Sequence, residues 1–353
     1  MKQVVVVGGG IAGLTTALHL MDGAGDVPGG LRVVVVEAAH SPGGNIQTDR
    51  VEGFIIEKGP NGFLDNVPTT PALVRRLGLE SELVRADDAA AKRFLYRNGR
   101  LHQLPTGPLE FLKSPVLSLK GRLRVLGEPF APGKPEGVDE SIFDFARRRI
   151  GEEAASVLID AMVSGVFAGN VRDLSLASSF PKMAAMEEEH GGLVRAMVSR
   201  MKERRLARRE VALLGAQGED VEELTRPGGP AGPGGTLTSF RDGLDTLPGA
   251  LARELGDGVR CGFRVTALEK NTSDAPEASP WLVHSASGEA LGADALVMAL
   301  PGPGAKGILR TLDQRLAELV GQIPAAGLAV VALGYELSGM GEAPDGFGFL
   351  VPR

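Results

Sequence analysis

The stretch VVVVGGGIAGLTTALHLM, residues 4–21, constrains the fold of this chain more than any other. Its four valines form a β-branched run that is typical of a strand buried on both faces of a parallel sheet. After the glycines, apolar residues recur at helical spacing from Ile11 to Met21. A second β-branched run, Val33–Val36, follows a polar, glycine-rich loop. The order strand, helix, strand predicts a β-α-β unit and an α/β domain with a parallel sheet.

The glycines of the first turn have the spacing Gly8-x-Gly10-x-x-Gly13. Between a strand and a helix, Gly8 permits a tight turn, Gly10 lets the backbone approach a pyrophosphate, and Gly13 lets helix and strand pack closely. The free N–H groups of the helix N-terminus, at Ile11 and Ala12, favour a bound phosphate. We therefore expect a dinucleotide here. The alternative is that these glycines only turn the chain.

Glu37 ends the second predicted strand, 24 residues after Gly13. A carboxylate at this place accepts hydrogen bonds from a ribose diol and repels a 2′-phosphate. The acid thus favours FAD or NAD over NADP, and we include its neighbour Ala38 in the predicted cofactor site. A solvated strand end is the alternative interpretation of Glu37.

The composition argues against several functional classes. A net charge of −6 over 353 residues makes nucleic acid an unsuitable main partner, because phosphate neutralisation needs a basic excess. One cysteine, Cys261, fits a reducing compartment, and we expect it to pack at a strand start. We see no signal peptide and no apolar run near the ~20 residues of a membrane span, and we expect a cytoplasmic protein. The five histidines lack ligand spacing, so no metal site is expected.

Helical and strand-like textures alternate along the rest of the chain. Helices are expected over residues 141–168, 177–209 and 305–319, and over 238–255 with a break or kink at Pro248. The Gly- and Pro-rich stretch 215–235 has the composition of a linker. Strands are expected at 259–268, 281–285, 295–300 and 328–335.

The segments after Glu37 resemble the flavin amine oxidase superfamily. Its extended motif is GGGxxGLxxAxxL, an acid, and then a glycine pair that covers the flavin diphosphate. Gly43 and Gly44 match that pair, although a plain turn after Pro42 is the alternative. A second segment is similar to the GPNSF sequence at the flavin face, with glycine in place of serine: Gly59, Pro60, Asn61, Gly62 and Phe63. The resemblance implies that FAD is the cofactor and that Gly59, Pro60 and Asn61 help to bind it.

Within the superfamily, the chain resembles the oxygen-dependent protoporphyrinogen oxidases most closely. The matching segments occur in the family's order: KRFLY and LPTG (92–96, 104–107), AMVSGVFAGN (161–170), LS and FP (174–175, 180–181), FRDGL (240–244) and PDGFGFLVP (344–352). Asp242 stands where the family has the first glycine of F-x-G-G-L. The resemblance implies FAD-dependent oxidation of protoporphyrinogen IX to protoporphyrin IX, a step of haem biosynthesis, with O2 as acceptor and H2O2 as product.

The resemblance also suggests which residues contact the tetrapyrrole. Arg93, with Phe94 beside it, is the candidate for binding a propionate, because a guanidinium binds a carboxylate bidentately. A surface arginine beside Lys92 is the alternative. An apolar wall around the macrocycle is expected from Val166, Phe167, Ala168 and Gly169. For Val166 and Phe167, packing in a helical core is the alternative.

Little acid–base machinery is expected, because the cofactor supplies the difficult chemistry. Asn61 is the candidate catalytic residue, since it can orient the substrate near the flavin. A turn-forming asparagine before Gly62 is the alternative.

The resemblance implies a discontinuous FAD domain. It consists of residues 1–88 and about 236–302, in which Val265 lies in a strand that reads the adenine edge. Ordinary strands are the alternative. Residues 90–210 form a helical insertion that faces substrate or membrane, 211–235 form a Gly- and Pro-rich loop, and 303–353 begin a mixed substrate-binding sheet.

Three questions stay open at this stage. The basic run 195–209 allows peripheral contact with the inner face of the cell membrane, although a solvated helix face is the alternative. A homodimer is also open. Members of the family continue beyond the length of this chain, so we expect it to lack the C-terminal segment that closes over the flavin. The alternative functions are another flavin-dependent amine oxidase or polyene desaturase, and a truncated, non-catalytic paralogue.

Overall fold

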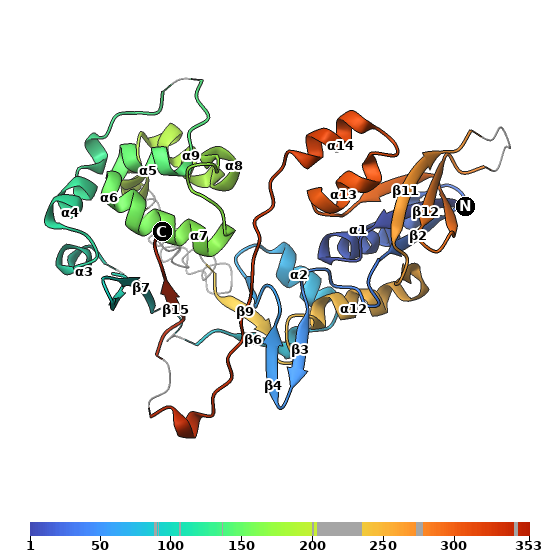
Figure 1. The fold of residues 1–353 in the computed structure, drawn as a ribbon, viewed down its shortest axis with the longest axis horizontal. Helices are drawn as coiled ribbons and strands as arrows, with labels where there is room; N and C mark the ends of the chain where they lie inside the picture. Colours follow the sequence, from blue (N-terminus) through green and yellow to red (C-terminus); the bar gives the residue numbers. More distant parts are fainter. Residues whose placement is uncertain are drawn as a thin grey trace, which may run out of the picture. The chain divides into compact units, whose positions relative to one another are not determined.

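The structure, a computed structural model, describes residues 1–87, 90, 92–105, 107–135, 137–199, 201–202, 235–272, 278–341 and 345–353 (Figure 1). The chain divides into two compact units. Unit 1 comprises residues 1–86, 236–325 and 329–334, and unit 2 comprises 87–235, 326–328 and 335–353. The predicted linker as far as residue 234, and residues 203–209 of the basic run, lie outside the described residues.

A four-stranded parallel sheet is the centre of unit 1. Its strands, in spatial order, are β10 (Val259–Arg260), β2 (Leu31–Val36), β1 (Lys2–Val7) and β14 (Ala295–Met298). Helix α1 (Ile11–Asp22) connects β1 to β2. The predicted β-α-β unit and the α/β fold class are therefore confirmed.

Successive side chains of β1 and β2 point to opposite faces of the sheet, and both faces are buried, which explains why the two strands carry valine runs. Val4, Val6, Val33 and Val35 belong to one core cluster, which α1 and α12 (Thr246–Leu255) also enter. Val5, Val7, Val34 and Val36 belong to a second cluster on the opposite face of the sheet. That second cluster includes Leu268, Val283 and Ala293 from a separate antiparallel sheet, which consists of β11 (Val265–Lys270), β12 (Trp281–Ser285) and β13 (Ala290–Ala293). Both faces of the parallel sheet are thus covered, as the uninterrupted valine runs predict.

The remaining elements of unit 1 are short. They are η1 (Ala24–Asp26), β3 (Thr48–Val51), β4 (Phe54–Glu57), β5 (Phe63–Leu64), α2 (Thr69–Arg76), η2 (Glu80–Glu82), β6 (Leu83–Arg85), β9 (Leu237–Phe240), η6 (Gly256–Gly258), β11 (Val265–Lys270), β12 (Trp281–Ser285), β13 (Ala290–Ala293), α13 (Gly302–Leu309) and α14 (Gln314–Gly321).

Unit 2 packs helices beside a mixed sheet, β15-β7-β8, in which β15 is parallel and β8 antiparallel to β7. Its elements are β7 (Arg93–Arg97), β8 (Arg100–Gln103), α3 (Pro108–Lys113), α4 (Leu119–Leu126), η4 (Glu128–Phe130), α5 (Ile142–Ile150), α6 (Glu152–Ala154), the π-helical turn η5 (Ala155–Ile159), α7 (Asp160–Phe167), α8 (Leu176–Ser179), α9 (Pro181–His190), η7 (Leu337–Gly339) and β15 (Gly348–Leu350). No helix among the described residues has both the length and the hydropathy needed to cross a bilayer.

The expected helix over 238–255 is wrong in its first half. Residues 237–240 form β9, which pairs with β5 and β6, and α12 begins only at Thr246. Pro248 does not break this helix, because it is the third helical residue. A proline in the first turn removes an N–H group that has no intrahelical acceptor.

Two other predicted elements are each divided. The expected strand 259–268 is two strands in two sheets, β10 and β11, and Gly262 between them has φ +75°. The expected helix 305–319 is α13 and α14, because Asp313 caps a new helix by accepting a hydrogen bond from Leu316 N at 2.9 Å. The expected strand is divided because its two halves pair in different sheets, and the expected helix is divided because Asp313 starts a second helix.

The expected strand 328–335 is wrong. These residues form no strand, and all of them are exposed, with Val331 79% exposed. Strand propensity depends on a neighbouring strand to pair with. No strand of the described residues pairs with this stretch.

The two helical blocks are present as shorter helices. Gly151, with φ +95°, separates α5 from α6, and Pro181 starts α9 after the residue that caps α8. Gly191, with φ +72°, ends α9, and residues 193–199 are helical again. Glycine and proline ended helices that apolar periodicity alone would continue.

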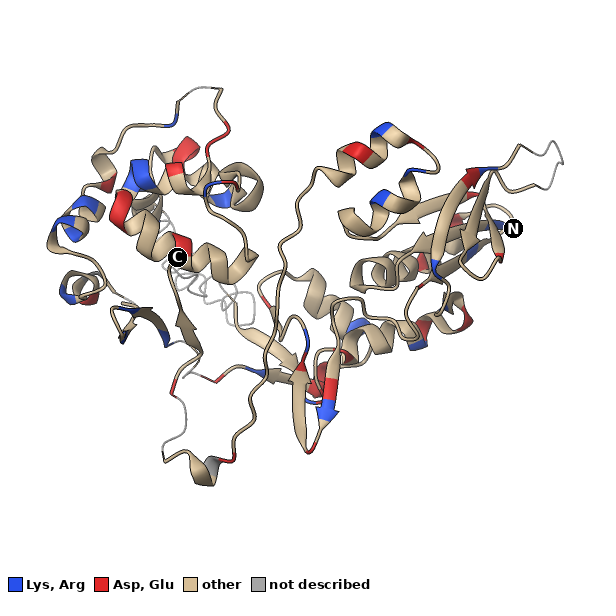
Figure 2. Cartoon of the chain, viewed as in Figure 1, with Lys and Arg blue, Asp and Glu red and all other residues tan. Residues whose placement is uncertain are grey.

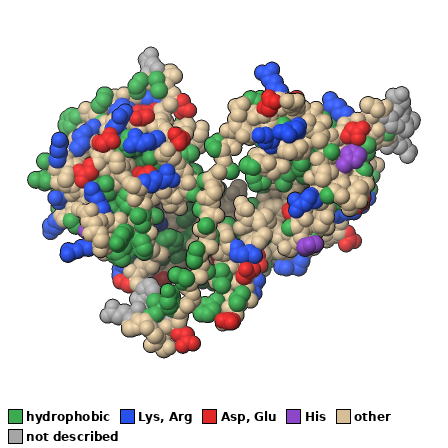
Figure 3. All heavy atoms as spheres, in the orientation of Figure 1, with side chains coloured by type: hydrophobic (Ala, Val, Ile, Leu, Met, Phe, Trp, Pro, Cys, Tyr) green, Lys and Arg blue, Asp and Glu red, His purple; other side chains and the backbone are tan. Residues whose placement is uncertain are grey.

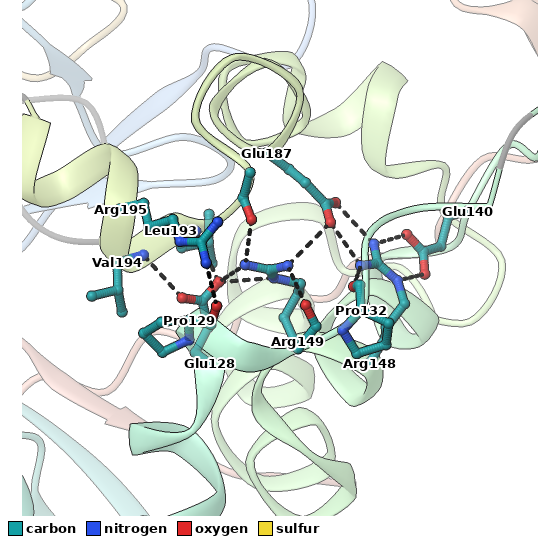
Figure 4. A network of polar contacts seen from close by, with 12 residues as sticks. Glu128, Pro129, Pro132, Glu140, Arg148, Arg149, Glu187, Leu193, Val194 and Arg195 are labelled. Atoms are coloured by element: carbon teal, nitrogen blue, oxygen red, sulfur yellow. Dashed lines mark hydrogen bonds and ion pairs between the residues drawn. The ribbon is translucent and has the colours of Figure 1, made fainter.

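A buried ionic network joins the helices of unit 2 (Figure 4). Arg149, which is fully buried, donates from Nε to Glu128 at 2.8 Å, and Glu128 accepts from Leu193 N at 2.9 Å. Arg148 bridges Glu140 and Glu187, each at 2.7 Å, and these bonds raise the pKa of its guanidinium. Figure 2 shows the charges of both signs on these helices. The network thereby ties η4, α5 and α9 to the start of the helical segment 193–199.

Candidate functional site: a dinucleotide cradle in unit 1

The first glycine turn is closely packed. Gly8 has φ +113°, and a Cβ atom there would lie 2.6 Å from the carbonyl oxygen of Ala299. A Cβ atom on Gly13 would lie 1.9 Å from the carbonyl oxygen of Gly8. Neither position can therefore hold a side chain. Gly8 permits the tight turn and Gly13 permits the close approach of helix to strand, as the sequence predicts.

Gly10 is different, because a Cβ atom there would meet nothing nearer than Gly44 Cα at 3.9 Å. Space therefore remains in front of the backbone at this residue. Gly10 is the N-cap of α1, and no side chain of the described residues caps this helix. The first N–H groups of α1, among them those of Ile11 and Ala12, have no intrahelical acceptor and suit a phosphate.

The Glu37 carboxylate is fixed beside this turn by two backbone groups. Its Oε2 accepts from Gly9 N at 2.7 Å, and its Oε1 accepts from Ala39 N at 2.8 Å. Each oxygen keeps a lone pair for a further donor, such as a ribose hydroxyl. Gly9 was missed by sequence reasoning, although it is the middle glycine of the GGG run. A Cβ atom there would lie 2.9 Å from that of Glu37.

Gly43 and Gly44 pack directly against the first turn. Gly43 N donates to Gly9 O at 2.8 Å, and a Cβ atom on Gly44 would lie 3.2 Å from Gly10 Cα. Both have positive φ, +131° and +60°. The tertiary fold therefore brings the two glycine groups into one loop cluster.

The GPNGF segment continues this cluster. A Cβ atom on Gly59 would lie 2.2 Å from Asn45 O, so the backbone before Pro60 crosses the loop that follows Gly44. Asn61 is exposed. A Cβ atom on Gly62 would lie 2.8 Å from the carbonyl oxygen of Thr238, which accounts physically for the glycine at this position.

The segment before Val265 runs alongside Glu37. Phe263 N donates to Glu37 O and Gly262 N to Ala39 O, each at 2.8 Å, and Val265 then begins β11. Ala38, which is exposed, lies between the two residues whose carbonyl groups accept these hydrogen bonds. Cys261 is exposed, so the expected packing role is wrong. Partial desolvation of the sulfur, and secondly the charge of Glu37, raise the pKa of its thiol.

The candidate substrate residues lie in unit 2. Arg93 begins β7, and its guanidinium lies 5.9 Å from the ring centre of Phe347. Phe94 pairs in register with Phe349 of β15, and Lys92 forms an ion pair with Asp345 at 2.5 Å. The KRFLY and GFGFLVP segments are therefore adjacent strands.

The predicted apolar wall is the C-terminal end of α7 and the turn after it. Val166 is 67% exposed, which excludes the alternative that it packs in the helical core. Phe167 packs edge-on against Phe180, with ring centres 5.3 Å apart. Ala168 has φ +50° and caps α7, and Gly169 lies against Leu174. An apolar cavity of about 30 Å³ lies among α5, α7 and α9, far smaller than a tetrapyrrole requires.

The parallel sheet, the uncapped helix N-terminus, the fixed acid and the open face of Gly10 define a Rossmann-like dinucleotide-binding protein. Comparison then identifies the family, because the model of the flavin-containing amine oxidoreductases matches residues 11–346. The chain belongs to this family, and FAD is its cofactor. The residues of the cradle fit that cofactor: the N–H groups at the start of α1 would bind a diphosphate, and the Glu37 carboxylate would accept hydrogen bonds from a ribose diol.

Curated relatives match nearly the whole chain. It is 30% identical to coproporphyrinogen III oxidase of Bacillus subtilis (strain 168), over the full chain and 70% of that protein. It is 33% identical to chloroplastic protoporphyrinogen oxidase of Oryza sativa subsp. japonica and 34% identical to protoporphyrinogen oxidase of Homo sapiens. These matches cover 99% of the chain, and 63% and 70% of the relatives. The chain thus spans about two thirds of their length.

Solved structures confirm the fold. The chain superposes on a protein of Exiguobacterium sp. 255-15 with a TM-score of 0.67 at 24% identity, covering 90% of this chain and 63% of that one. Reduced UDP-galactopyranose mutase gives a TM-score of 0.59 at 17% identity, covering 92% and 62%. At these identities the likeness concerns architecture alone.

Proposed function

We propose that the chain belongs to an enzyme that oxidises a porphyrinogen, with protoporphyrinogen IX converted to protoporphyrin IX. The main support is that the chain is 30–35% identical to named porphyrinogen oxidases over 99–100% of its length. The B. subtilis relative's name adds coproporphyrinogen III as a second substrate of the same chemical class. When bound, FAD supplies the two-electron oxidation of a ring carbon, and O2 accepts the electrons to give H2O2.

This chain's own residues would bind, orient and shield the substrate. The Arg93 guanidinium would bind a propionate, and its contact with the Phe347 ring would hold it in position. The exposed side chains of Val166 and Phe167 offer apolar surface to the macrocycle. Asn61, exposed in the GPNGF segment, would orient the reacting edge.

The assay is formation of porphyrin fluorescence from protoporphyrinogen IX, and from coproporphyrinogen III, under air with FAD-loaded protein. We expect oxidation above the rate of a protein-free control, with one H2O2 released for each O2 consumed. Arg93→Gln should raise KM about tenfold, because one charge-assisted hydrogen bond is lost. Peroxide release from an amine, with no porphyrin formed, would instead support the amine oxidase alternative. A protein that binds no flavin would support the non-catalytic alternative.

We also propose peripheral contact with the inner face of the cell membrane. On α4, Leu119, Leu123 and Leu126 are exposed at helical spacing, and Lys113 and Lys120 are exposed nearby in the sequence. Figure 3 shows hydrophobic side chains beside Lys and Arg on the face of unit 2 drawn there. Apolar groups flanked by cations favour anionic lipid. We expect the unsubstituted chain to sediment with phosphatidylglycerol vesicles but not with phosphatidylcholine vesicles. Leu123→Ser should not sediment with phosphatidylglycerol vesicles. Equal sedimentation of the unsubstituted chain and Leu123→Ser would contradict membrane contact through α4.

A further inference from the structure

We propose that Arg353 is a second carboxylate-binding residue of the substrate site and that Asp160 positions it. The inference rests on the proposed function, because it assigns a further residue to the same porphyrinogen site. The segment that resembles the family ends at Pro352, and Asp160 was expected only as part of the helix over 141–168. Neither residue has a spacing that would mark it.

Asp160 anchors the chain that leaves β15. The carboxylate is buried in the first turn of α7, and its Oδ2 accepts from the backbone N of Arg353 at 3.0 Å. A buried carboxylate is costly unless donors satisfy it, so this bond fixes the place of Arg353. The same two elements touch one turn later, because a Cβ atom on Gly165 would lie 2.7 Å from Leu350. Figure 1 shows the C-terminus beside α7.

The Arg353 side chain reaches the predicted substrate wall. Its Nη2 donates to the carbonyl oxygen of Gly169 at 3.3 Å, and the side chain is exposed. A guanidinium has five N–H donors, and this contact uses one of them. Within the described part of the chain, no carboxylate forms an ion pair with this guanidinium. It therefore keeps donors for a bidentate carboxylate.

A second polar group lies on α7 close to this anchor. The Ser164 hydroxyl oxygen is buried and has no hydrogen-bond partner among the described residues. Residues i and i+4 share one face of a helix, so Ser164 lies on the face of Asp160. A buried hydroxyl without a partner calls for an acceptor from outside the protein, such as water or ligand oxygen.

Arg93 and Arg353 are placed to bind carboxylates at different edges of a macrocycle. Arg93 pairs in register with Gly348 at the start of β15, whereas Arg353 follows the end of that strand. Five residues of extended chain span at most about 17 Å, the order of a porphyrin with its side chains. A substrate with propionates on opposite edges, as in coproporphyrinogen, would contact both guanidinium groups.

The test is a fluorescence titration of the FAD-loaded chain with coproporphyrin III, with protoporphyrin IX, and with the methyl ester of each. We expect Arg353→Gln to raise the Kd for coproporphyrin III about tenfold, the cost of one charge-assisted hydrogen-bonded pair. The Kd for protoporphyrin IX should rise by less. Binding of the esters should not change. Arg353→Lys keeps the charge but not the bidentate geometry, so its affinity for coproporphyrin III should lie between those of Arg353→Gln and the unsubstituted chain. Arg100→Gln, at an exposed arginine of β8, is the matched control.

Asp160 is tested by a conservative rescue. Asp160→Ala should raise the Kd for coproporphyrin III as much as Arg353→Gln does, although the Arg353 charge remains. It should also speed amide hydrogen exchange at residues 348–353. Asp160→Asn keeps an acceptor oxygen and should behave like the unsubstituted chain. If Asp160→Ala does not fold, the Arg353 titrations alone decide. If Arg353→Gln changes the Kd for coproporphyrin III less than about twofold, the inference is wrong, and the proposed function still stands. Failure of the unsubstituted chain to bind either porphyrin would overturn both.

Discussion

Glu37 is held by the N–H groups of Gly9 and Ala39, and this geometry decides what a substitution does. In Glu37→Gln, one of the two backbone donors would face an amide NH2 group, and the negative charge beside the ribose would be lost. We expect FAD to bind at least about tenfold more weakly, as for a lost charge-assisted hydrogen bond. Quenching of flavin fluorescence measures this affinity. Glu289→Gln, an exposed acid of the same unit paired with Arg260, should leave it unchanged. Equal FAD affinity for Glu37→Gln would exclude a ribose-binding role.

Cys261 offers a pH-dependent probe, since it is the only cysteine in the sequence. Partial desolvation of the sulfur and the charge of Glu37 raise the pKa of its thiol, which disfavours the reactive thiolate. The rate of labelling by a disulfide reagent should therefore reach its midpoint at a higher pH than for free cysteine. Glu37→Gln should move the midpoint partly back, because burial is the larger cause. A midpoint at or below that of free cysteine would contradict this account.

At the scale of elements, the β1–α1 turn predicts opposite outcomes for two glycine substitutions. Gly10→Ala places its Cβ atom in open space at a φ of −75°, so the protein should fold with its stability unchanged or raised by about 0.4–1 kcal/mol. The methyl group would occupy the approach to the diphosphate, and FAD affinity should fall at least about tenfold. Gly13→Ala forces a Cβ atom onto Gly8 O and should cost about 1–3 kcal/mol or more.

Urea unfolding and flavin titration of both variants separate the two effects. If Gly10→Ala binds FAD normally, the open face of Gly10 does not receive the diphosphate. If Gly13→Ala is as stable as the unsubstituted chain, the close approach of α1 to β1 is wrong.

The ionic network of unit 2 predicts a large loss of stability on breaking one pair. Glu128→Gln leaves the fully buried Arg149 without its charged partner and weakens the acceptor for Leu193 N and Val194 N. Removal of one partner from a buried pair costs about 3–5 kcal/mol. The free energy of urea unfolding should fall by that amount. Arg147→Gln, in an exposed pair with Asp144, is the control and should cost below about 1 kcal/mol. Similar small losses in both variants would show that the network contributes little.

At the scale of the whole molecule, all the cofactor candidates belong to unit 1 and all the substrate candidates except Asn61 belong to unit 2. A ligand that binds only the folded state stabilises it by about 2.7 kcal/mol at a hundred times its Kd. FAD should therefore slow amide exchange chiefly in β1, β2 and the loop at Gly43 and Gly44. Hydrogen exchange with and without FAD measures this, with Gly10→Ala as the matched control. Protection confined to unit 2 would contradict the assignment of the cradle.

Much of unit 1 was predictable because its signals are local. Two valine runs, a helical repeat between them and glycines at fixed spacing lie within 37 residues, and the parallel pairing of β1 with β2 follows from that order. The acid at Glu37 could be placed for the same reason. The errors occurred where the outcome depends on a distant partner: residues 259–268 divide between two sheets, and residues 328–335 have no pairing strand within the described part of the chain.

The sequence by itself determined the β-α-β unit, the glycine turn and its acid, since each depends on backbone sterics and side-chain periodicity within one segment. Only the tertiary structure decided that Gly43 N bonds to Gly9 O, that Arg93 meets Phe347, and that Arg353 rests on Asp160 and Gly169. These contacts join residues far apart in the chain. Spacing along a sequence carries no distance between such residues, because packing of the intervening elements sets it.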